Sequence, residues 1–97
     1  MSYLLTPEAE AELRDAAAFY AREVSPSTAI KFLTVFDEKA SLISRFPGLG
    51  TPTSKGRKLF PVGRFSYSFL YRDEGGNIRI SAVAHHSRRP GYWDGRV

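Results

Sequence analysis

The side chains suited to acid–base or phosphate chemistry are concentrated in the second half of this 97-residue chain. Cleavage of RNA without a metal needs a base for the 2′-hydroxyl, an acid for the leaving oxygen and cations for the phosphorane. Histidine, tyrosine, lysine and arginine can supply all three. The candidates are Arg57, Lys58, Arg64, Arg72, Arg79, His85, His86, Arg88, Arg89, Tyr92 and Arg96.

The two histidines are adjacent, at the end of an expected strand. Neighbouring strand residues point to opposite faces, so at most one of His85 and His86 can face a given site. Either histidine can instead be a hydrogen-bonded structural residue. Two adjacent histidines with no third ligand at helical or hairpin spacing do not make a zinc site, and the chain has no cysteine. We therefore expect neither a metal nor a cofactor.

The residues after the histidines also have two interpretations. Arg88 and Arg89 can bind phosphate or pair with acidic side chains of a protein partner. Tyr92 and Trp93 can stack on a base, or they can cover one edge of the core. Arg64 follows a turn signal and is the arginine we most expect to be exposed.

The charge is distributed unevenly along the chain. Residues 1–50 contain 5 Lys or Arg and 7 Asp or Glu, a balance of −2, whereas residues 51–97 contain 9 and 3, a balance of +6. This asymmetry favours an anionic partner, either nucleic acid or an acidic protein segment, although a basic soluble face would look the same.

The composition indicates one small globular domain over residues 1–97, with 42% hydrophobic and 13% aromatic residues. The absence of cysteine favours the cytoplasm. The first residues lack a basic region followed by an apolar stretch, so we expect no signal peptide. No window approaches the roughly 18 apolar residues that a membrane span requires.

The first half of the chain predicts a strand and two helices. Residues 3–5 read as a short strand, and Thr6-Pro7-Glu8 as a helix start. Ser25-Pro26 repeats that start signal. Apolar residues recur at helical spacing after each start, and the short connection predicts an antiparallel helix hairpin. Residues 47–52 are rich in glycine and proline and predict a loop.

The second half predicts three strands, over residues 58–62, 65–72 and 78–83, with a hairpin loop at 73–77. The row Phe65, Tyr67, Phe69 and Tyr71 has strand spacing and should face the helices. The expected fold is therefore a single α+β domain of order β-α-α-β-β-β, in which a three-stranded antiparallel meander packs on the helix hairpin.

Seven short blocks, in order, resemble the RelE/ParE toxin superfamily, and within it the ParE-like or plasmid stabilisation group. The last block is the most specific. The blocks are residues 9–13 with Ala17 and Tyr20, Ala29 with Phe32, and residues 46–50, 64–68, 70–72, 82–85 and 88–93. The resemblance implies a RelE/ParE-like fold and a cognate antitoxin that wraps the toxin in a hetero-oligomer.

The superfamily also implies a target, but its members divide between two. ParE-like members inhibit DNA gyrase, which would make this chain a non-enzymatic binder. RelE-like members cut messenger RNA on the ribosome, which would use His85 or Tyr92 in proton transfer. A third possibility is a member that binds its antitoxin but has lost toxicity. Gyrase inhibition is the expected function, and ribosome-dependent cleavage is the alternative.

The two targets assign different roles to the same basic half of the chain. As a nuclease site, the residues in comparable places are Lys58, Arg64, His85, Arg88 and Tyr92. As a contact surface for a target, they are Arg64, His85, Arg88, Arg89, Tyr92 and Trp93.

Overall fold

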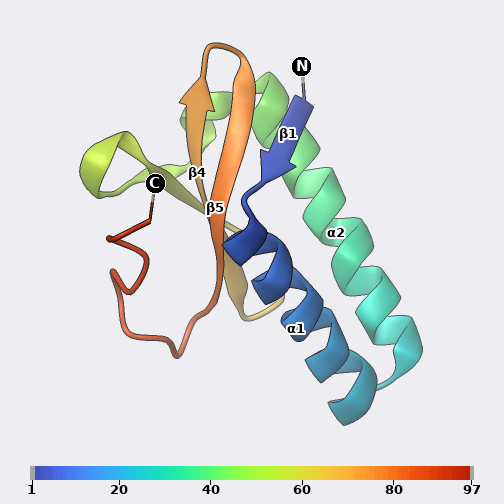
Figure 1. Cartoon of the computed structure of the whole chain (residues 1–97). Helices are drawn as coiled ribbons and strands as arrows, with labels where there is room; N and C mark the ends of the chain where they lie inside the picture. The colour runs from blue at the N-terminus through green and yellow to red at the C-terminus, as the bar shows by residue number, and fades with distance from the viewer. Residues whose placement is uncertain (1, 97) are drawn as a thin grey trace.

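A computed structural model describes residues 2–96, and Met1 and Val97, the ends of the expected domain, lie outside the described residues. It confirms the α+β fold: two helices cover one face of a sheet of order β1-β5-β4-β3-β2 (Figure 1). No helix within residues 2–96 has the length and apolarity to cross a bilayer. The elements are β1 (Ser2–Leu5), α1 (Pro7–Glu23), α2 (Pro26–Arg45), η1 (Pro47–Leu49), β2 (Thr51–Pro52), η2 (Ser54–Gly56), β3 (Lys58–Pro61), β4 (Tyr67–Glu74) and β5 (Asn77–His85).

Both helices begin where the sequence predicts. The Thr6 hydroxyl accepts a hydrogen bond from the Ala9 backbone N–H at 3.2 Å, and the Ser25 hydroxyl accepts one from the Thr28 N–H at 3.1 Å. Each cap is followed by a proline that has no N–H to satisfy. Only two residues separate α1 from α2, so the helices form the expected hairpin.

The strands confirm the antiparallel meander of β3, β4 and β5 and add two features. β1 pairs in parallel with β5. The helix hairpin first returns the chain to the end of the sheet where β1 begins, and the antiparallel meander of β3, β4 and β5 then makes the last strand run in the direction of β1. The predicted hairpin loop 73–77 shortens to Gly75-Gly76. Both glycines have positive φ, 68° and 96°, and a two-residue turn of this kind matches the twist of the flanking strands.

The predicted loop 47–52 is partly regular. It contains η1 and the two-residue strand β2, which pairs with β3. A buried side chain holds it there: the Tyr71 hydroxyl donates to the Pro47 carbonyl at 2.6 Å and accepts from the Gly50 N–H at 2.9 Å. Gly50 has room for no side chain, since a Cβ would lie 2.5 Å from that hydroxyl oxygen. Composition predicted the loop but not this long-range anchor.

The main core lies between the sheet and the helices, and the aromatic row of β4 faces it as predicted. Tyr20, Phe32, Phe65 and Tyr67 form a cluster with ring centroids 5.1–5.9 Å apart. Aromatic rings at these separations favour edge-to-face contacts, as most of these pairs show. The core therefore follows directly from the period-two pattern of β4 and the apolar stripe of α2.

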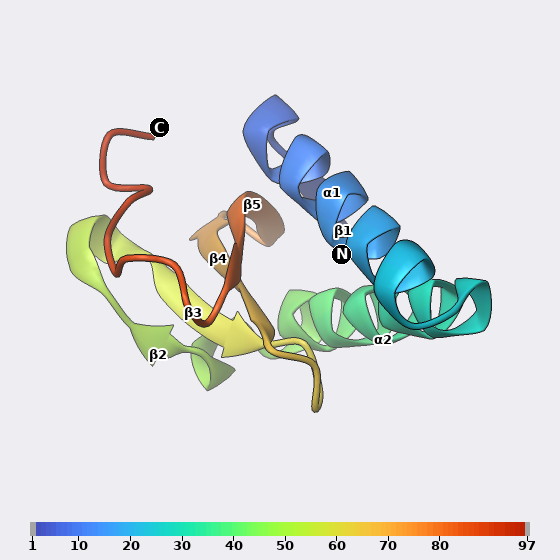
Figure 2. The same ribbon diagram turned by 90° about the horizontal axis from the view of Figure 1, so that it is seen from below.

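The opposite face of the sheet is covered as well. Residues 86–96, called the C-terminal strap below, cross this face on the side away from the helices (Figure 2). A second apolar cluster lies beneath the strap, and its members are Leu70, Ala82, Ala84 and Trp93, with Leu59 and Tyr92 at its margin. The sheet is thus buried on both faces at its centre, although it has helices on only one.

Candidate functional site

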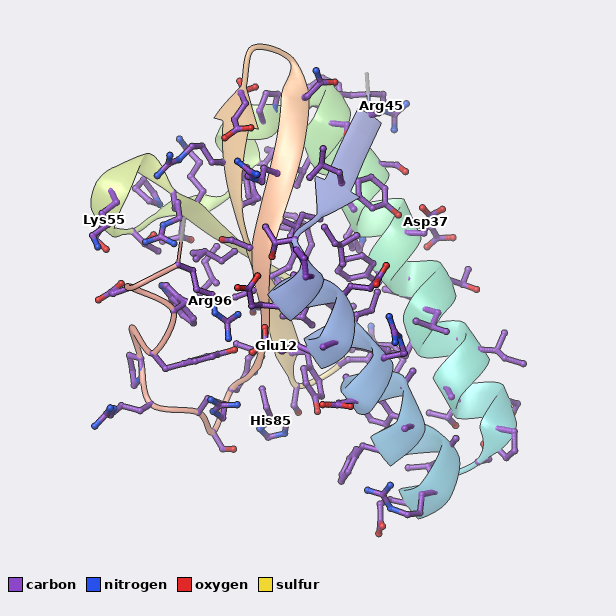
Figure 3. The ribbon with its side chains drawn as sticks, viewed as in Figure 1. Glu12, Asp37, Arg45, Lys55, His85 and Arg96 are labelled. Carbon is purple, nitrogen blue, oxygen red and sulfur yellow. The ribbon has the colours of Figure 1, made fainter. Side chains whose placement is uncertain are left out.

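The C-terminal strap is joined to α1 and β5 through the carboxylate of Glu12. Oε1 accepts hydrogen bonds from Arg96 Nη1 at 2.7 Å and from the Val83 N–H at 3.0 Å. Oε2 accepts from the Tyr92 hydroxyl at 2.6 Å and from Arg96 Nη2 at 3.1 Å. Figure 3 shows Glu12 and Arg96 pointing toward one another between the helix and the strap. One side chain therefore connects three segments that are distant in sequence.

The charges of this cluster support one another. Burial raises the pKa of Glu12, but the hydrogen bonds from Arg96, Tyr92 and the Val83 N–H outweigh it, so the pKa is lowered overall. Burial, followed by the hydrogen bond to Glu12, raises the pKa of Tyr92 to about 12. The same carboxylate raises the pKa of Arg96 through its hydrogen bonds. At neutral pH the cluster is an ionised carboxylate, a protonated phenol and a guanidinium, all mutually satisfied.

Two cations hold the downstream end of the strap. The Arg57 side chain is buried under it, with Nη1 3.5 Å from the Trp93 carbonyl oxygen and 3.3 Å from that of Arg96. Its Nε and Nη2 have no hydrogen-bond partner within residues 2–96. Lys55 Nζ donates to the Asp94 carbonyl at 2.6 Å. These contacts fix the strap backbone independently of Glu12.

Arg88 lies near the start of the strap, over the face of the Tyr92 ring. Its guanidinium carbon is 4.0 Å from the ring centroid, which is a cation–π contact. The guanidinium also borders a pocket of about 210 Å³ lined by Glu12, Asp15, Tyr67 and His85. Arg88 is exposed, so its donors remain accessible while the aromatic ring fixes its position.

His85 packs edge-on against Tyr67, with ring centroids 5.0 Å apart. Its Nδ1 accepts a hydrogen bond from the Ser87 N–H at 3.0 Å and is 2.8 Å from the Ser87 hydroxyl. Because Nδ1 is an acceptor, the proton of the neutral ring is on Nε2. His86 points to the other face, where its Nε2 is 3.0 Å from the Ser68 hydroxyl. The two rings therefore have different partners, but both residues line one pocket of about 240 Å³, so the prediction that at most one of them can face a given site is wrong.

Trp93 is 8% exposed and packs in the second apolar cluster. Trp93 therefore covers one edge of the core, which was the alternative to stacking on a base. Its ring lies between the strap and the sheet. Arg89 is exposed on the strap beside Arg88. Arg88 contacts Tyr92, and it lines one pocket with His85 and Trp93. Arg89 adjoins Arg88 along the chain, and Trp93 alone of these five residues is buried.

Arg64 and Lys58 lie elsewhere. Arg64 is exposed in the turn before β4, as expected, and lines a groove of about 340 Å³ along α2 with Lys31, Val35, Lys39 and Phe65. Lys58 is opposite Tyr71 in the sheet, whereas His85 is opposite Tyr67. Tyr67 and Tyr71 are four positions apart along β4, which is about 13 Å. The five residues considered for a nuclease are therefore not gathered into one site.

The residues that the sequence analysis missed are Glu12, Arg57 and Arg96 in their anchoring roles. The hydrogen bonds of Glu12 span 71, 80 and 84 residues, so no local spacing signals them. Within residues 2–96 there is no group of three or more His, Asp or Glu placed to hold a metal ion.

The helix hairpin carries an exposed apolar surface. Of the seven large hydrophobic residues exposed among residues 2–96, four lie along α1, α2 and their connection: Phe19, Val24, Ile30 and Leu33, between 40% and 66% exposed. We call these four the hairpin surface. Exposed apolar residues gathered in this way are typical of a protein–protein contact.

Comparison with known proteins agrees with this fold. A family described as "ParE toxin of type II toxin-antitoxin system, parDE" matches residues 3–90. Ten solved chains match significantly. One of them, "Chromosomal ParDE TA system from P. aeruginosa", is 24% identical over 88% of this chain and 95% of that chain, with a TM-score of 0.75. No curated protein sequence matches.

Proposed function

Because its family match covers residues 3–90, this chain belongs to the ParE toxins of type II toxin–antitoxin systems, and we propose that it acts in the cytoplasm by binding and inhibiting DNA gyrase. The observation that carries the proposal is the C-terminal strap, which presents Arg88 and Arg89 on an anchored backbone. A surface that is ordered before binding loses little conformational entropy when it binds.

The arrangement supports binding better than cleavage of messenger RNA. A general acid and a general base must both be within hydrogen-bond reach of the reacting atoms. Here the Tyr92 hydroxyl is occupied by Glu12 with a pKa raised to about 12, and Lys58 is far from His85 along the sheet. Arg88 and Arg89 need no such geometry, because a cationic contact surface requires only exposure.

The test is a supercoiling assay with purified gyrase. We expect the wild-type chain to inhibit, and Arg88→Ala and Arg89→Ala each to raise the half-inhibitory concentration by about tenfold, as loss of a well-placed interface arginine does. Arg14→Ala is the matched control, because Arg14 is exposed on α1 and pairs only with Glu10 among the described residues. Normal supercoiling together with cleavage of ribosome-bound transcripts would establish the alternative function.

We also propose that a cognate antitoxin wraps α2, covering the hairpin surface and the groove on the other side of that helix. The groove is lined by two apolar side chains, Val35 and Phe65. Its charged lining is three cations and one carboxylate, Lys31, Lys39, Arg64 and Glu38, which leaves a net positive charge. An amphipathic segment with acidic residues at its margin complements both features. The toxin and antitoxin would then form a hetero-oligomer in which the helices, rather than the strap, carry most of the apolar contact.

The antitoxin contact is tested by Leu33→Glu, which places a charge on the hairpin surface. We expect antitoxin affinity to fall by at least about a hundredfold, because a buried unpaired carboxylate costs several kcal/mol. Inhibition of gyrase should be unchanged. The matched control is Leu4→Glu, at a similarly exposed position on β1. Equal loss of affinity in both variants would contradict the assignment of the contact to the hairpin.

A further inference from the structure

We propose that Glu12 is a positioning residue of the toxin: through Tyr92 it fixes the guanidinium of Arg88 at the surface that contacts the target. This inference rests on the proposed function, since it assumes that Arg88 is part of that surface. The proposal gives a functional role to a carboxylate on α1, although the cations of the contact surface lie on the strap and not on this helix.

Glu12 is connected to the Tyr92 ring by a hydrogen bond. The Tyr92 hydroxyl is the only polar atom of its side chain, and it donates to Glu12 Oε2 at 2.6 Å. Glu12 is itself held in place by the Val83 N–H and by both terminal nitrogens of Arg96. The carboxylate side chain is only 17% exposed, so solvent competes weakly for these contacts. The hydroxyl end of the Tyr92 ring is therefore fixed from α1 and β5, while the ring itself also lies 5.2 Å from the Trp93 ring and 5.1 Å from the Arg96 guanidinium carbon.

The Tyr92 ring in turn contacts Arg88. The guanidinium lies 4.0 Å from the ring centroid. Within residues 2–96, Arg88 forms no ion pair, and its backbone N–H donates to the His85 carbonyl. The aromatic face is thus the contact that orients its side chain. An arginine stacked on a ring keeps its in-plane donors available for a partner.

The other anchors of the strap act further downstream. Arg57 binds the carbonyls of Trp93 and Arg96, and Trp93 itself packs in the second apolar cluster. Removal of the Glu12 carboxylate should therefore leave the strap attached to the sheet while releasing the Tyr92 ring. This separation makes a positioning role distinguishable from a general loss of structure.

The functional experiment compares Glu12→Ala with Glu10→Ala, a matched control because Glu10 lies on the same helix and pairs with Arg14 at the surface. We expect Glu12→Ala to raise the half-inhibitory concentration for gyrase by about tenfold, the effect of losing charge-assisted hydrogen bonds. Glu10→Ala should change nothing. Combined with Arg88→Ala, the Glu12 substitution should add no further loss, because both act through one contact.

A physical readout separates this role from folding. The protons of the Arg88 side chain should show ring-current shifts from Tyr92 in the NMR spectrum of the wild-type chain, and Glu12→Ala should reduce them. Tyr92→Phe keeps the ring but removes its tie to Glu12, so it should reduce the shifts in a chain that retains its core. Antitoxin affinity should be unchanged in both variants.

Two results would overturn the inference: unaltered Arg88 shifts in both variants, or losses from Glu12→Ala and Arg88→Ala that add. Failure of the proposed function gives a different result. In that case the wild-type chain does not inhibit gyrase, or Arg88→Ala and Arg89→Ala leave its inhibition unchanged, whatever happens to the Arg88 shifts. If Glu12→Ala does not fold, Tyr92→Phe carries the test alone, with the same two readouts.

Discussion

The two faces of the sheet are covered in different ways. On the helix face, α1 and α2 bury large aromatic and aliphatic side chains, and the contacts have little directional character. On the strap face, four buried apolar residues form a small cluster, and the remaining attachment depends on hydrogen bonds to Glu12, Arg57 and Lys55. The helix face buries most of the apolar side chains, whereas the strap face supplies a fixed position for exposed cations.

This difference implies that the two faces respond differently to substitution. The free energy gained by apolar burial is proportional to the buried area, so small shifts of side chains change it little. A charged hydrogen-bond cluster depends on each partner being present. A defect on the helix face should therefore lower the stability of the whole chain. A defect on the strap face should loosen residues 86–96 first and reduce target binding more than stability.

The largest effect is expected from Phe69→Ala on the helix face. Phe69 is 0% exposed, and its ring lies 5.4 Å from that of Phe36 and 5.9 Å from that of Tyr71, measured between centroids. Truncation of such a ring costs about 3–5 kcal/mol, because a cavity remains among rigid neighbours. Urea denaturation should show this loss as a single cooperative transition. A local loss confined to residues 86–96 would contradict the comparison.

Trp93→Ala makes the corresponding cavity on the strap face and should cost less, about 2–3 kcal/mol. The ring packs against Leu70 and two alanines, and it is covered by a loop that can collapse inward. Hydrogen exchange should accelerate in residues 86–96 and remain slow in β4. If β4 exchanged as fast as the strap, the two faces would form one cooperative unit.

The contrast also explains how much of the fold the sequence predicted. The helix starts at Thr6 and Ser25 are encoded by neighbouring residues, and the aromatic row of β4 by its period of two, so local reasoning found them. The strap was not predicted, because its attachment depends on Glu12, which is 80 residues from Tyr92. No periodicity connects such distant residues.

The same reasoning applies to the candidate site. The block from His85 to Trp93 was identified as chemically suited, and the structure places most of it on the strap and at its start. Sequence reasoning could not separate Trp93, which is buried, from Arg88, which is exposed, since both belong to one contiguous block. That separation depends on which side of the strap faces the sheet.

Acidification should affect the strap face through Glu12. Its pKa is lowered from 4.5 in the folded chain, so the stabilisation it provides is fully present above pH 4.5 and is lost as the pH falls through the folded value. Glu12→Gln should cost about 1–2 kcal/mol at neutral pH, since it removes the charge but keeps a partner for the Val83 N–H.

This prediction is checked by denaturation at neutral pH and below pH 4.5. The difference between wild type and Glu12→Gln should narrow as the pH falls, because the wild-type carboxyl becomes neutral as well. Glu10→Gln is the control, since its ion pair with Arg14 is exposed and contributes little. A difference that stays constant with pH would show that the charge of Glu12 does not stabilise the strap.

The smallest effect is expected at alkaline pH, where one tyrosine from each face can be compared. Burial and a hydrogen bond to a carboxylate raise the pKa of Tyr3, bonded to Asp37 of α2, to about 12, and they raise that of Tyr92, bonded to Glu12, to about 12 as well. Because the pKa is raised on folding, the stabilisation that each protonated hydroxyl provides is fully present below pH 10 and is lost as the pH rises through about 12.

Tyrosinate absorbance, followed in the wild type, Tyr3→Phe and Tyr92→Phe, assigns the two ionisations. Tyr3 packs at the margin of the helix-covered core, and its hydroxyl bonds to the exposed Asp37 of α2. We expect its ionisation to follow loosening of the helix face rather than of the strap. Tyr92 joins the strap to α1, and the strap can detach while the core persists. We therefore expect Tyr92 to ionise at a lower pH than Tyr3, although the pKa of each hydroxyl is raised to about 12 in the intact chain. Simultaneous ionisation would mean that the strap opens only when the helix face unfolds, and the division between a stabilising face and a positioning face would then fail.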